Sequence, residues 1–328
     1  MNLRNHHLVL KARPDGKPGP EHFSEAEQPA RPLGQDEVLL ATRYISIDPA
    51  MRVWMDEDPG YVPPIALGET MRAGGVAEVL ESNSNALRPG DIVLGRVGWQ
   101  THPTLPATGL TKIDEQLGDA LAWLGPLGMT GMTAYFGLLR VGALGANETV
   151  MVSAACGGVG QLVGQIARAH GARTIGISGG PEKCRIAREE HGFDDVVDYH
   201  DTGFTGQMPD GIDVYFDNVG GPILDAAITK LAMRGRVVVC GRISQTATSE
   251  LYGVRSLGML IGRRARLEGF VVSDFASEFA EARQWIADKL QSGELHQRVQ
   301  LLDGLNSCPA GLAMLFNSAN TGKLIVQL

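Results

Sequence analysis

A glycine-rich turn between a predicted strand and a predicted helix most restricts how this chain can fold. Residues 150–160 read V-M-V-S-A-A-C-G-G-V-G, an apolar run that leads into a turn. Ala154, Gly157 and Gly160 form an A-x-x-G-x-x-G pattern, a variant of the dinucleotide-binding fingerprint. Glycines at such positions let the backbone approach a pyrophosphate, whose charge the following helix N-terminus stabilises.

The residues on both sides of the turn fit this interpretation. Met151–Ala155 is apolar, and side chains recur after the turn with the spacing of one helical face at Leu162, Val163, Ile166, Ala167 and His170. A strand–turn–helix without a ligand is the alternative, because tight turns need glycine for many reasons. The context favours a dinucleotide site formed by Ala154, Gly157, Gly158, Val159 and Gly160.

The end of the second predicted strand indicates which dinucleotide binds. Enzymes that use NAD carry an acidic residue there, which bonds the adenosine ribose. Here Arg173–Ser178 is followed by Gly179, with Lys183 just beyond and no carboxylate. This arrangement leaves room for a 2′-phosphate and supplies a cation, so NADP(H) is favoured, although Lys183 taken alone also fits a solvated charge on a helix.

The chain divides into two compositions, and its 328 residues suffice for two domains. Up to about residue 120, Pro, Gly and short β-like runs predict a β-rich domain. Beyond it, strands alternate with helices, which predicts an α/β domain with a doubly wound parallel sheet. The predicted strands are Val150–Ala154, Thr174–Ser178, Asp195–Tyr199, Val214–Asn218, Arg236–Gly241 and Leu267–Val272. The predicted helices include Val159–His170, Glu182–His191, Pro222–Met233 and Glu278–Gln291.

The tail after Glu294 has strand-like runs at Val299–Leu302 and Lys323–Leu328 around a short helical run. A tail of this kind can return to complete the first domain. We therefore expect one domain from 1–122 and 295–328, and a dinucleotide-binding domain from 123–294.

Charge and composition argue against several classes of partner. The net charge of −8, from 29 basic and 37 acidic residues, comes without a basic run typical of nucleic-acid binding. The nearest candidate, Arg263-Arg264-Ala265-Arg266, fits a local surface or pocket feature. No apolar run reaches the roughly 18 residues of a membrane span, and no secretory signal is visible, so we expect a cytoplasmic protein. Four widely spaced cysteines and no metal-spacing histidine pair predict neither disulfides nor a metal site.

Further motifs run in order along almost the whole chain. They include D-P-A-M-R at Asp48–Arg52, G-E-T-M-R-A-G-G at Gly68–Gly75, L-G-M-T-G-M-T-A-Y-F-G-L-L at Leu127–Leu139, Y-F-D-N-V-G-G at Tyr215–Gly221, C-G-R-I-S at Cys240–Ser244 and N-T-G-K-L at Asn320–Leu324. With the glycine turn, they resemble the medium-chain dehydrogenase/reductases, specifically the zinc-independent, NADP-dependent branch of alkenal double-bond, prostaglandin and curcumin reductases. The resemblance implies a GroES-like substrate domain and a Rossmann NADP-binding domain.

The resemblance also implies roles for individual residues. In this family, the residues matching Lys183 and Tyr199 contact the 2′-phosphate of NADP, and the one matching Asn218 approaches the nicotinamide ribose. With Ser178 and Gly179 at the second strand, the other expected cofactor-lining residues are Met129, Thr130, Cys240, Gly241, Ile243, Ser244, Phe270, Val271, Val272 and Asn320. Phe270 and Val271 also suit the core of a strand.

The expected reaction follows from a contrast with zinc-dependent relatives. Those carry a cysteine near the position of Asp48 and a Gly-His-Glu motif near Gly68, and neither is present here. Metal-assisted alcohol oxidation is therefore disfavoured. We expect hydride transfer from NADPH to the β-carbon of an α,β-unsaturated ketone or aldehyde, followed by protonation of the enolate.

The proton donor departs from the family pattern. Ala50 and Gly262 stand where relatives often carry tyrosine. Tyr61 is the expected substitute, with a loop aromatic as the alternative, and Tyr252 is a poorer candidate. Arg52 either helps to bind a carbonyl or the cofactor, or forms a structural ion pair.

Two other functions stay open. A quinone reductase would not need the donor tyrosine, and an NADPH-binding protein with little turnover is compatible with the same fold. The resemblance further implies a homodimer through edge strands near Leu251–Gly269, where an exposed edge would otherwise be a liability.

Overall fold

The computed structural model describes residues 3–248 and 250–328. The first two residues, which we count in the first predicted domain, and position 249 lie outside the described part. The chain separates into two compact units. Unit 1 comprises Met1–Leu124, Val299–Asn320 and Leu324–Leu328, and unit 2 comprises Gly125–Arg298 and Thr321–Lys323.

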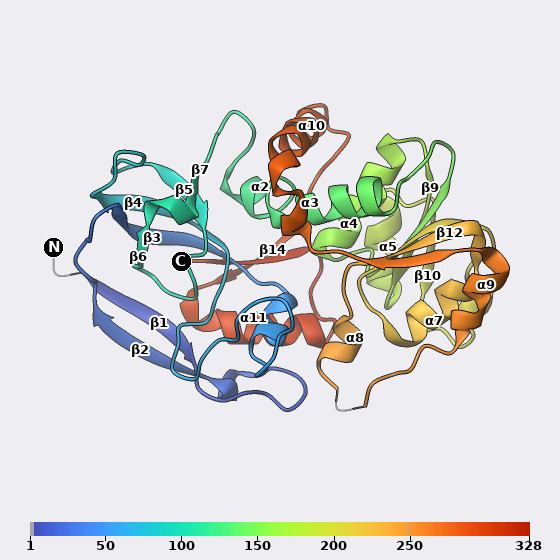
Figure 1. The fold of residues 1–328 in the computed structure, drawn as a ribbon, viewed down its shortest axis with the longest axis horizontal. Coiled ribbons are helices and arrows are strands. Elements are labelled where there is room, and N and C mark those ends of the chain that lie inside the picture. The colour runs from blue at the N-terminus through green and yellow to red at the C-terminus, as the bar shows by residue number, and fades with distance from the viewer. Residues whose placement is uncertain (1–2, 249) are drawn as a thin grey trace. The chain divides into compact units, whose positions relative to one another are not determined.

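Unit 1 is rich in β-structure (Figure 1). In its described part, a seven-stranded sheet follows the order β14-β15-β3-β4-β5-β7, with β6 paired to β3, and β1 and β2 form a separate antiparallel pair. The strands are β1 Arg4–Leu10, β2 Phe23–Pro29, β3 Glu37–Ser46, β4 Gly75–Ser82, β5 Ile92–Gly95, β6 Thr104–Pro106, β7 Leu110–Lys112, β14 Val299–Asp303 and β15 Lys323–Gln327. The helices are α1 Ala50–Trp54, α2 Ala120–Leu124 and α11 Cys308–Phe316.

Unit 2 confirms the predicted doubly wound sheet. Its six described strands pair in parallel in the order β10-β9-β8-β11-β12-β13. They are β8 Thr149–Ser153, β9 Arg173–Ser178, β10 Asp195–Asp198, β11 Ile212–Asp217, β12 Leu231–Val239 and β13 Arg266–Gly269. The helices are α3 Met129–Phe136, α4 Gly158–Ala169, α5 Pro181–Glu189, α6 Phe204–Gln207, α7 Gly221–Thr229, α8 Ile243–Thr246, α9 Met259–Arg263 and α10 Phe279–Gln291.

The strand order decides where a ligand can bind. After β8, the chain forms β9 and then β10 on one side of that strand. It then crosses back and forms β11 on the other side of β8. In an open parallel sheet, ligands bind beyond the carboxyl ends of the strands where the order reverses. The turn after β8 lies at this switch point.

Burial explains why the strands are apolar throughout rather than alternating. Helix α7 covers one face, where Ile223 and Ile228 join the same buried cluster as Met151 and Tyr215. Neighbouring strand residues such as Val152 and Phe216 are buried on the other face. Among the described residues, no helix combines the length and apolar character needed to cross a membrane.

Several predicted elements end one or two residues early, and two end earlier still. The strand predicted to reach Val272 stops at Gly269, so Phe270 and Val271 lie beyond it. The helix predicted to reach Met233 stops at Thr229, because Leu231 already pairs with Ile212 in the sheet.

Candidate functional site

The glycine turn forms a cradle at the carboxyl end of β8. A Cβ at Gly160 would lie 2.2 Å from the carbonyl oxygen of Ala154, and one at Gly157 would lie 3.1 Å from the same atom. Ala154 itself has a φ of 52°, in the left-handed region. Helix α4 begins directly after Gly157, so its first amide groups point out of the turn.

The start of α4 has the donors that an anion needs. The first recorded helical bond runs from the Gln161 amide to the Gly157 carbonyl. Within the part of the chain that the structure describes, the amides of Val159 and Gly160 show no acceptor. Helix N-termini of this kind bind phosphate groups.

Residues from distant segments border this turn within unit 2. A Cβ at Gly158 would lie 3.3 Å from Cγ2 of Thr130 and 3.2 Å from Cδ of Lys323. The amide of Gly322 donates to the carbonyl of Cys156 at 2.8 Å. Met129, at the start of α3, is exposed, whereas Thr130 is buried.

The residues predicted to hold a 2′-phosphate follow β9 and β10. A Cβ at Gly179 would lie 2.6 Å from Cζ of Tyr199, so the ring covers this turn. Lys183 is half-buried on the first turn of α5, and burial lowers the pKa of its ammonium group. The buried hydroxyl of Ser178 has no hydrogen-bond partner among the described residues.

A carboxylate does lie nearby, on the neighbouring strand. Oδ1 of Asp198, at the end of β10, accepts the amides of Gly180 and His200, each at 2.9 Å. These bonds fasten the turn after β9 to the residues after β10. The end of β9 itself carries no acidic side chain, which is the arrangement expected where a phosphate binds.

The other half of the sheet presents Asn218 beyond β11. Its Nδ2 donates to the carbonyl of Ser153 at 2.7 Å, and its amide donates to Oγ of Ser153 at 2.8 Å. Cys240 and Gly241 follow β12, and their amides donate to the carbonyl of Asp217. Oγ of Ser244, next to Ile243 on α8, donates to the carbonyl of Val219 at 2.7 Å.

The remaining predicted cofactor residues have less defined surroundings. The ring of Phe270 lies close to Gly137, where a Cβ would be 2.7 Å from its Cζ. Val271 is exposed, and Val272 begins a short 3₁₀ segment. Asn320 belongs to unit 1 and directly precedes the unit 2 residues Thr321–Lys323.

Both predicted catalytic residues lie in unit 1. The indole Nε1 of Trp54 donates to the hydroxyl oxygen of Tyr61 at 3.0 Å, and Tyr61 is 51% exposed. The buried guanidinium of Arg52 donates to the carbonyls of Gly16 and Pro14, at 2.8 and 3.0 Å, and pairs with Asp56. These contacts suit the structural alternative for Arg52, and its predicted catalytic role stays a prediction.

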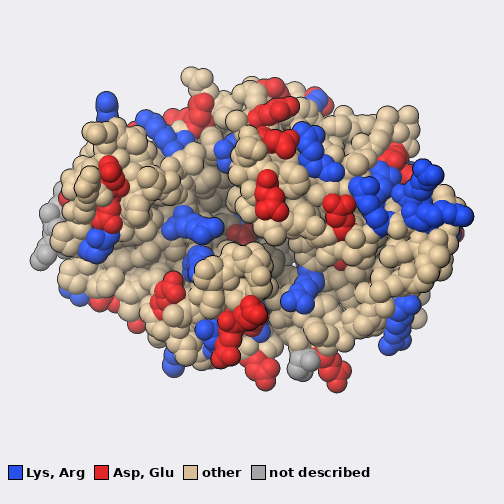
Figure 2. Space-filling model, viewed as in Figure 1, with Lys and Arg blue, Asp and Glu red and all other residues tan. Residues whose placement is uncertain are grey.

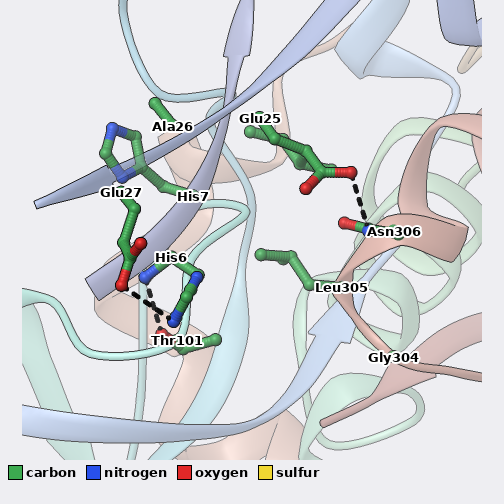
Figure 3. Close-up of a pocket in the computed structure, with 10 residues that line it drawn as sticks. His6, His7, Glu25, Ala26, Glu27, Thr101, Gly304, Leu305 and Asn306 are labelled. Atoms are coloured by element: carbon green, nitrogen blue, oxygen red, sulfur yellow. Dashed lines mark hydrogen bonds and ion pairs between the residues drawn. The ribbon is translucent and has the colours of Figure 1, made fainter. Parts of the chain in front are cut away.

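Unit 1 also contains a cavity of about 620 Å³ that involves none of the predicted site residues (Figure 3). Its acidic side chains already have partners: Glu25 accepts Nδ2 of Asn306 at 2.8 Å, and Glu27 pairs with Arg4 and His6. The carboxylates that line the cavity are therefore already paired with other side chains of unit 1.

Two residues of the site escaped the sequence analysis. The carboxylate of Asp217 and the hydroxyl of Ser153 are fully buried and lie 3.2 Å apart beneath Asn218. Asp217 directly precedes Asn218 in the motif Y-F-D-N-V-G-G, so this motif could have identified Asp217 as a candidate site residue. The partnership with Ser153 was not visible because it depends on the pairing of β8 with β11.

Comparisons with known families match both halves of the chain. Residues 6–113 match a family described as the N-terminal domain of oxidoreductase, and residues 158–288 match one described as zinc-binding dehydrogenase. In residues 3–248 and 250–328, no three His, Cys, Asp or Glu side chains are grouped so as to hold a metal ion.

Individual proteins resemble the chain over nearly its full length. The NADPH-dependent curcumin reductase of Escherichia coli (strain K12) is 38% identical over 335 residues, covering 99% of this chain and 97% of that protein. The NADP(+)-dependent 2-alkenal reductase of Nicotiana tabacum is 38% identical, covering 90% and 89%. The crystal structure of CurA from Vibrio vulnificus in complex with NADPH superposes with a TM-score of 0.93 at 36% identity, covering 98% of both chains.

Proposed function

The chain belongs to the medium-chain dehydrogenase/reductase family, in its NADP-dependent branch, and we propose that it reduces the C=C bond of α,β-unsaturated ketones or aldehydes with NADPH and no metal. The observation that carries this proposal is the cradle after β8 combined with the end of β9. The cradle admits a backbone approach to a pyrophosphate, and the end of β9 offers Lys183 and Tyr199 where an acidic residue would repel a 2′-phosphate.

NADP(H) is the cofactor, and unit 2 supplies the groups to hold it. The free amides of Val159 and Gly160 bind the pyrophosphate. The ammonium of Lys183 binds the 2′-phosphate. Burial lowers the pKa of this lysine, and an anion beside it stabilises the charged form. The buried hydroxyl of Ser178 is a further polar group at this end.

The bound cofactor supplies a hydride, and the chain supplies orientation and a proton. We assign the proton to the hydroxyl of Tyr61. Its oxygen accepts the Trp54 indole N–H, so its own hydrogen is not used in that bond. The same indole stabilises the oxygen once the proton has left, which is what a general acid requires.

Arg52 supports this assignment indirectly. Its guanidinium ties α1, which carries Trp54, to the carbonyls of Pro14 and Gly16. We therefore propose that Arg52 fixes the helix that orients Tyr61, whether or not it also contacts a carbonyl substrate.

The test is NADPH oxidation by the purified protein with a medium-chain 2-alkenal, an aryl enone and a quinone, and with NADH in parallel. Turnover of the alkenal or enone with a preference for NADPH supports the proposal. Turnover of the quinone alone favours a quinone reductase, which would not need a donor tyrosine. NADPH binding without turnover of any substrate would favour a binding protein.

We propose that the protein is a homodimer joined through β13. All four residues of this edge strand are exposed, as are the nearby Ile261, at 83%, and Leu257. An exposed edge beside apolar side chains is typical of an interface. Figure 2 shows Lys and Arg side chains gathered on the end of unit 2 that carries β12 and α9. Within β13, Arg266 pairs with Glu268.

Light scattering after size exclusion tests the dimer. Ile261→Asp should yield a monomer, whereas Leu301→Asp, at an exposed leucine of unit 1, should not change the mass. A wild-type monomer would contradict the proposed dimer.

We also propose that unit 1 is the GroES-like substrate domain and unit 2 the Rossmann domain. A cytoplasmic location is a further proposal. The four free cysteines support it, since thiols stay reduced in that compartment.

A further inference from the structure

We propose that Asp217 is a positioning residue that holds the nicotinamide half of the cofactor site in its binding geometry. This inference rests on the proposed NADPH-binding function and adds to it a residue that does not itself touch the cofactor.

The side chain of Asp217 is surrounded by donors. It is fully buried at the carboxyl end of β11. Its Oδ1 accepts the hydroxyls of Tyr215 and Ser153, at 2.9 and 3.2 Å. The same oxygen accepts the amides of Val219 and Gly220, at 3.2 and 3.0 Å, and Oδ2 accepts the Gly220 amide at 3.1 Å.

These bonds determine the path of the chain after β11. Gly220 and Gly221 both have positive φ values, of 71° and 61°, so this turn needs an anchor to hold its shape. The carboxylate of Asp217 is this anchor, because it accepts the amides of Val219 and Gly220. The carbonyl of Val219 then accepts the hydroxyl of Ser244, which connects the turn to α8.

Asp217 reaches Asn218 through Ser153. The Ser153 hydroxyl donates to the carboxylate and accepts the Asn218 amide at 2.8 Å. The carbonyl of Ser153 accepts Nδ2 of Asn218, so the orientation of the Asn218 side chain is fixed as well. The main-chain carbonyl of Asp217 accepts the amides of Cys240 and Gly241, at 2.9 and 3.0 Å. One residue thus holds both loops that border this half of the site.

The donor set requires an acceptor at this position. Burial raises the pKa of the Asp217 carboxyl, while the amides and hydroxyls around it favour the charged form. An alanine would leave these donors without their acceptor, whereas an asparagine would keep an oxygen where Oδ1 lies, the atom that accepts most of them. A buried donor that loses its acceptor costs enough to move the turn.

Strand order indicates that the effect is confined to one half of the cofactor. In a sheet with this order, the β8–β9–β10 half binds the adenosine part, and the half with β11 and β12 binds the nicotinamide part. Lys183 and Tyr199 follow β9 and β10, whereas Asp217 and Asn218 lie at β11. If Asp217 only stabilised the fold, its replacement would weaken the binding of both halves of the cofactor.

The experiment compares two probes by isothermal titration calorimetry. The probe 2′,5′-ADP contains the adenosine half with its 2′-phosphate, and NADP⁺ contains both halves. For Asp217→Ala we expect the Kd of NADP⁺ to rise roughly tenfold or more, and that of 2′,5′-ADP to stay within about twofold. The matched control is Asp213→Ala, near the other end of the same strand, where the carboxylate accepts the Thr149 amide at 2.9 Å. This variant should leave both affinities unchanged.

Equal weakening of both probes by Asp217→Ala, or no weakening of either, would overturn the inference. If this variant does not fold, Ser153→Ala removes the connecting hydroxyl and should produce the same selective loss of NADP⁺ affinity. A wild-type protein that binds neither probe would instead refute the proposed function, so the two failures are distinguishable.

Discussion

The ring of Tyr199 lies over the backbone of Gly179, at a distance that leaves no room for a Cβ there: such an atom would be 2.6 Å from Cζ of the ring. The ring also contacts His200 edge-on, with centroids 4.5 Å apart. Any side chain at position 179 would displace Tyr199, so this glycine lets the ring pack on the turn after β9. The proposed 2′-phosphate site lies at this turn.

Replacing Lys183 by alanine should weaken NADPH binding by roughly 10- to 100-fold, the effect of a lost charge-assisted bond, and NADH binding by less than about twofold. Fluorescence titration with both cofactors measures this. Arg185→Ala is the matched control, since Arg185 lies on the same helix but pairs with Glu182 and Glu189. Equal losses for NADPH and NADH would refute the 2′-phosphate assignment.

Replacing Gly160 by alanine should both destabilise unit 2 and impair NADPH binding. The new Cβ would lie 2.2 Å from a backbone oxygen, so the turn after β8 has to shift. We expect a loss of about 1–3 kcal/mol in the free energy of unfolding, as for other overpacked sites, and a Kd for NADPH raised at least about tenfold. Urea denaturation and titration measure the two effects.

Gly206→Ala is the control for this substitution, because a Cβ there would meet no atom within 4 Å. It should leave NADPH binding unchanged. A Gly160→Ala protein that binds NADPH as tightly as the wild type would show that the cradle does not hold the cofactor.

Replacing Tyr61 by phenylalanine should lower turnover of an enone by about 10²-fold or more, the usual contribution of a general acid, without changing cofactor affinity. Steady-state kinetics and a binding titration separate the two quantities. Tyr252→Phe is the matched control, because the Tyr252 hydroxyl already donates to Asp225 at 2.8 Å. Full turnover by Tyr61→Phe would mean that the proton comes from elsewhere.

Replacing His191 by leucine should make the protein less sensitive to acid. His191 is buried beside His296, and in the described residues neither of its ring nitrogens has a hydrogen-bond partner. Burial lowers the pKa of His191 from 6.5 to about 4. Between these values the unfolded chain binds a proton that the folded protein excludes, so the contribution to stability is complete above pH 6.5 and is lost as the pH falls toward 4.

At pH 5, the free energy of unfolding of the wild type should be about 2 kcal/mol lower than at high pH because of this proton, and the leucine variant should not show this loss. Urea denaturation at pH 8 and pH 5 gives the difference between the two proteins. If the free energy of unfolding falls equally for both proteins between pH 8 and pH 5, His191 is not the source of the acid sensitivity.

The fold was predictable where the sequence pattern is local. The apolar run before Gly157 and the helical spacing after it place β8 and α4 within one residue of their observed starts. The start of β12 was not predictable. Leu231 joins the sheet by pairing with Ile212, and Arg234, with a φ of 62°, lies in an irregular part of the strand. Neither the pairing nor the bend follows from residue propensity.

The site shows the same division. Ala154–Gly160 was recognisable because the fingerprint is contiguous in sequence. The bond between Ser153 and Asp217 joins residues 64 positions apart and exists only because β8 and β11 are neighbours. Likewise, the carbonyls that occupy Arg52 come from a loop 36 and 38 positions earlier.

The most direct test of the central claim is the product formed from an aryl enone with NADPH, identified by mass spectrometry and NMR alongside the amount of NADPH consumed. The proposed function predicts the saturated ketone, with its carbonyl intact and one NADPH oxidised for each molecule formed. An allylic alcohol as the product, or no NADPH consumption with any enone or alkenal, would contradict it.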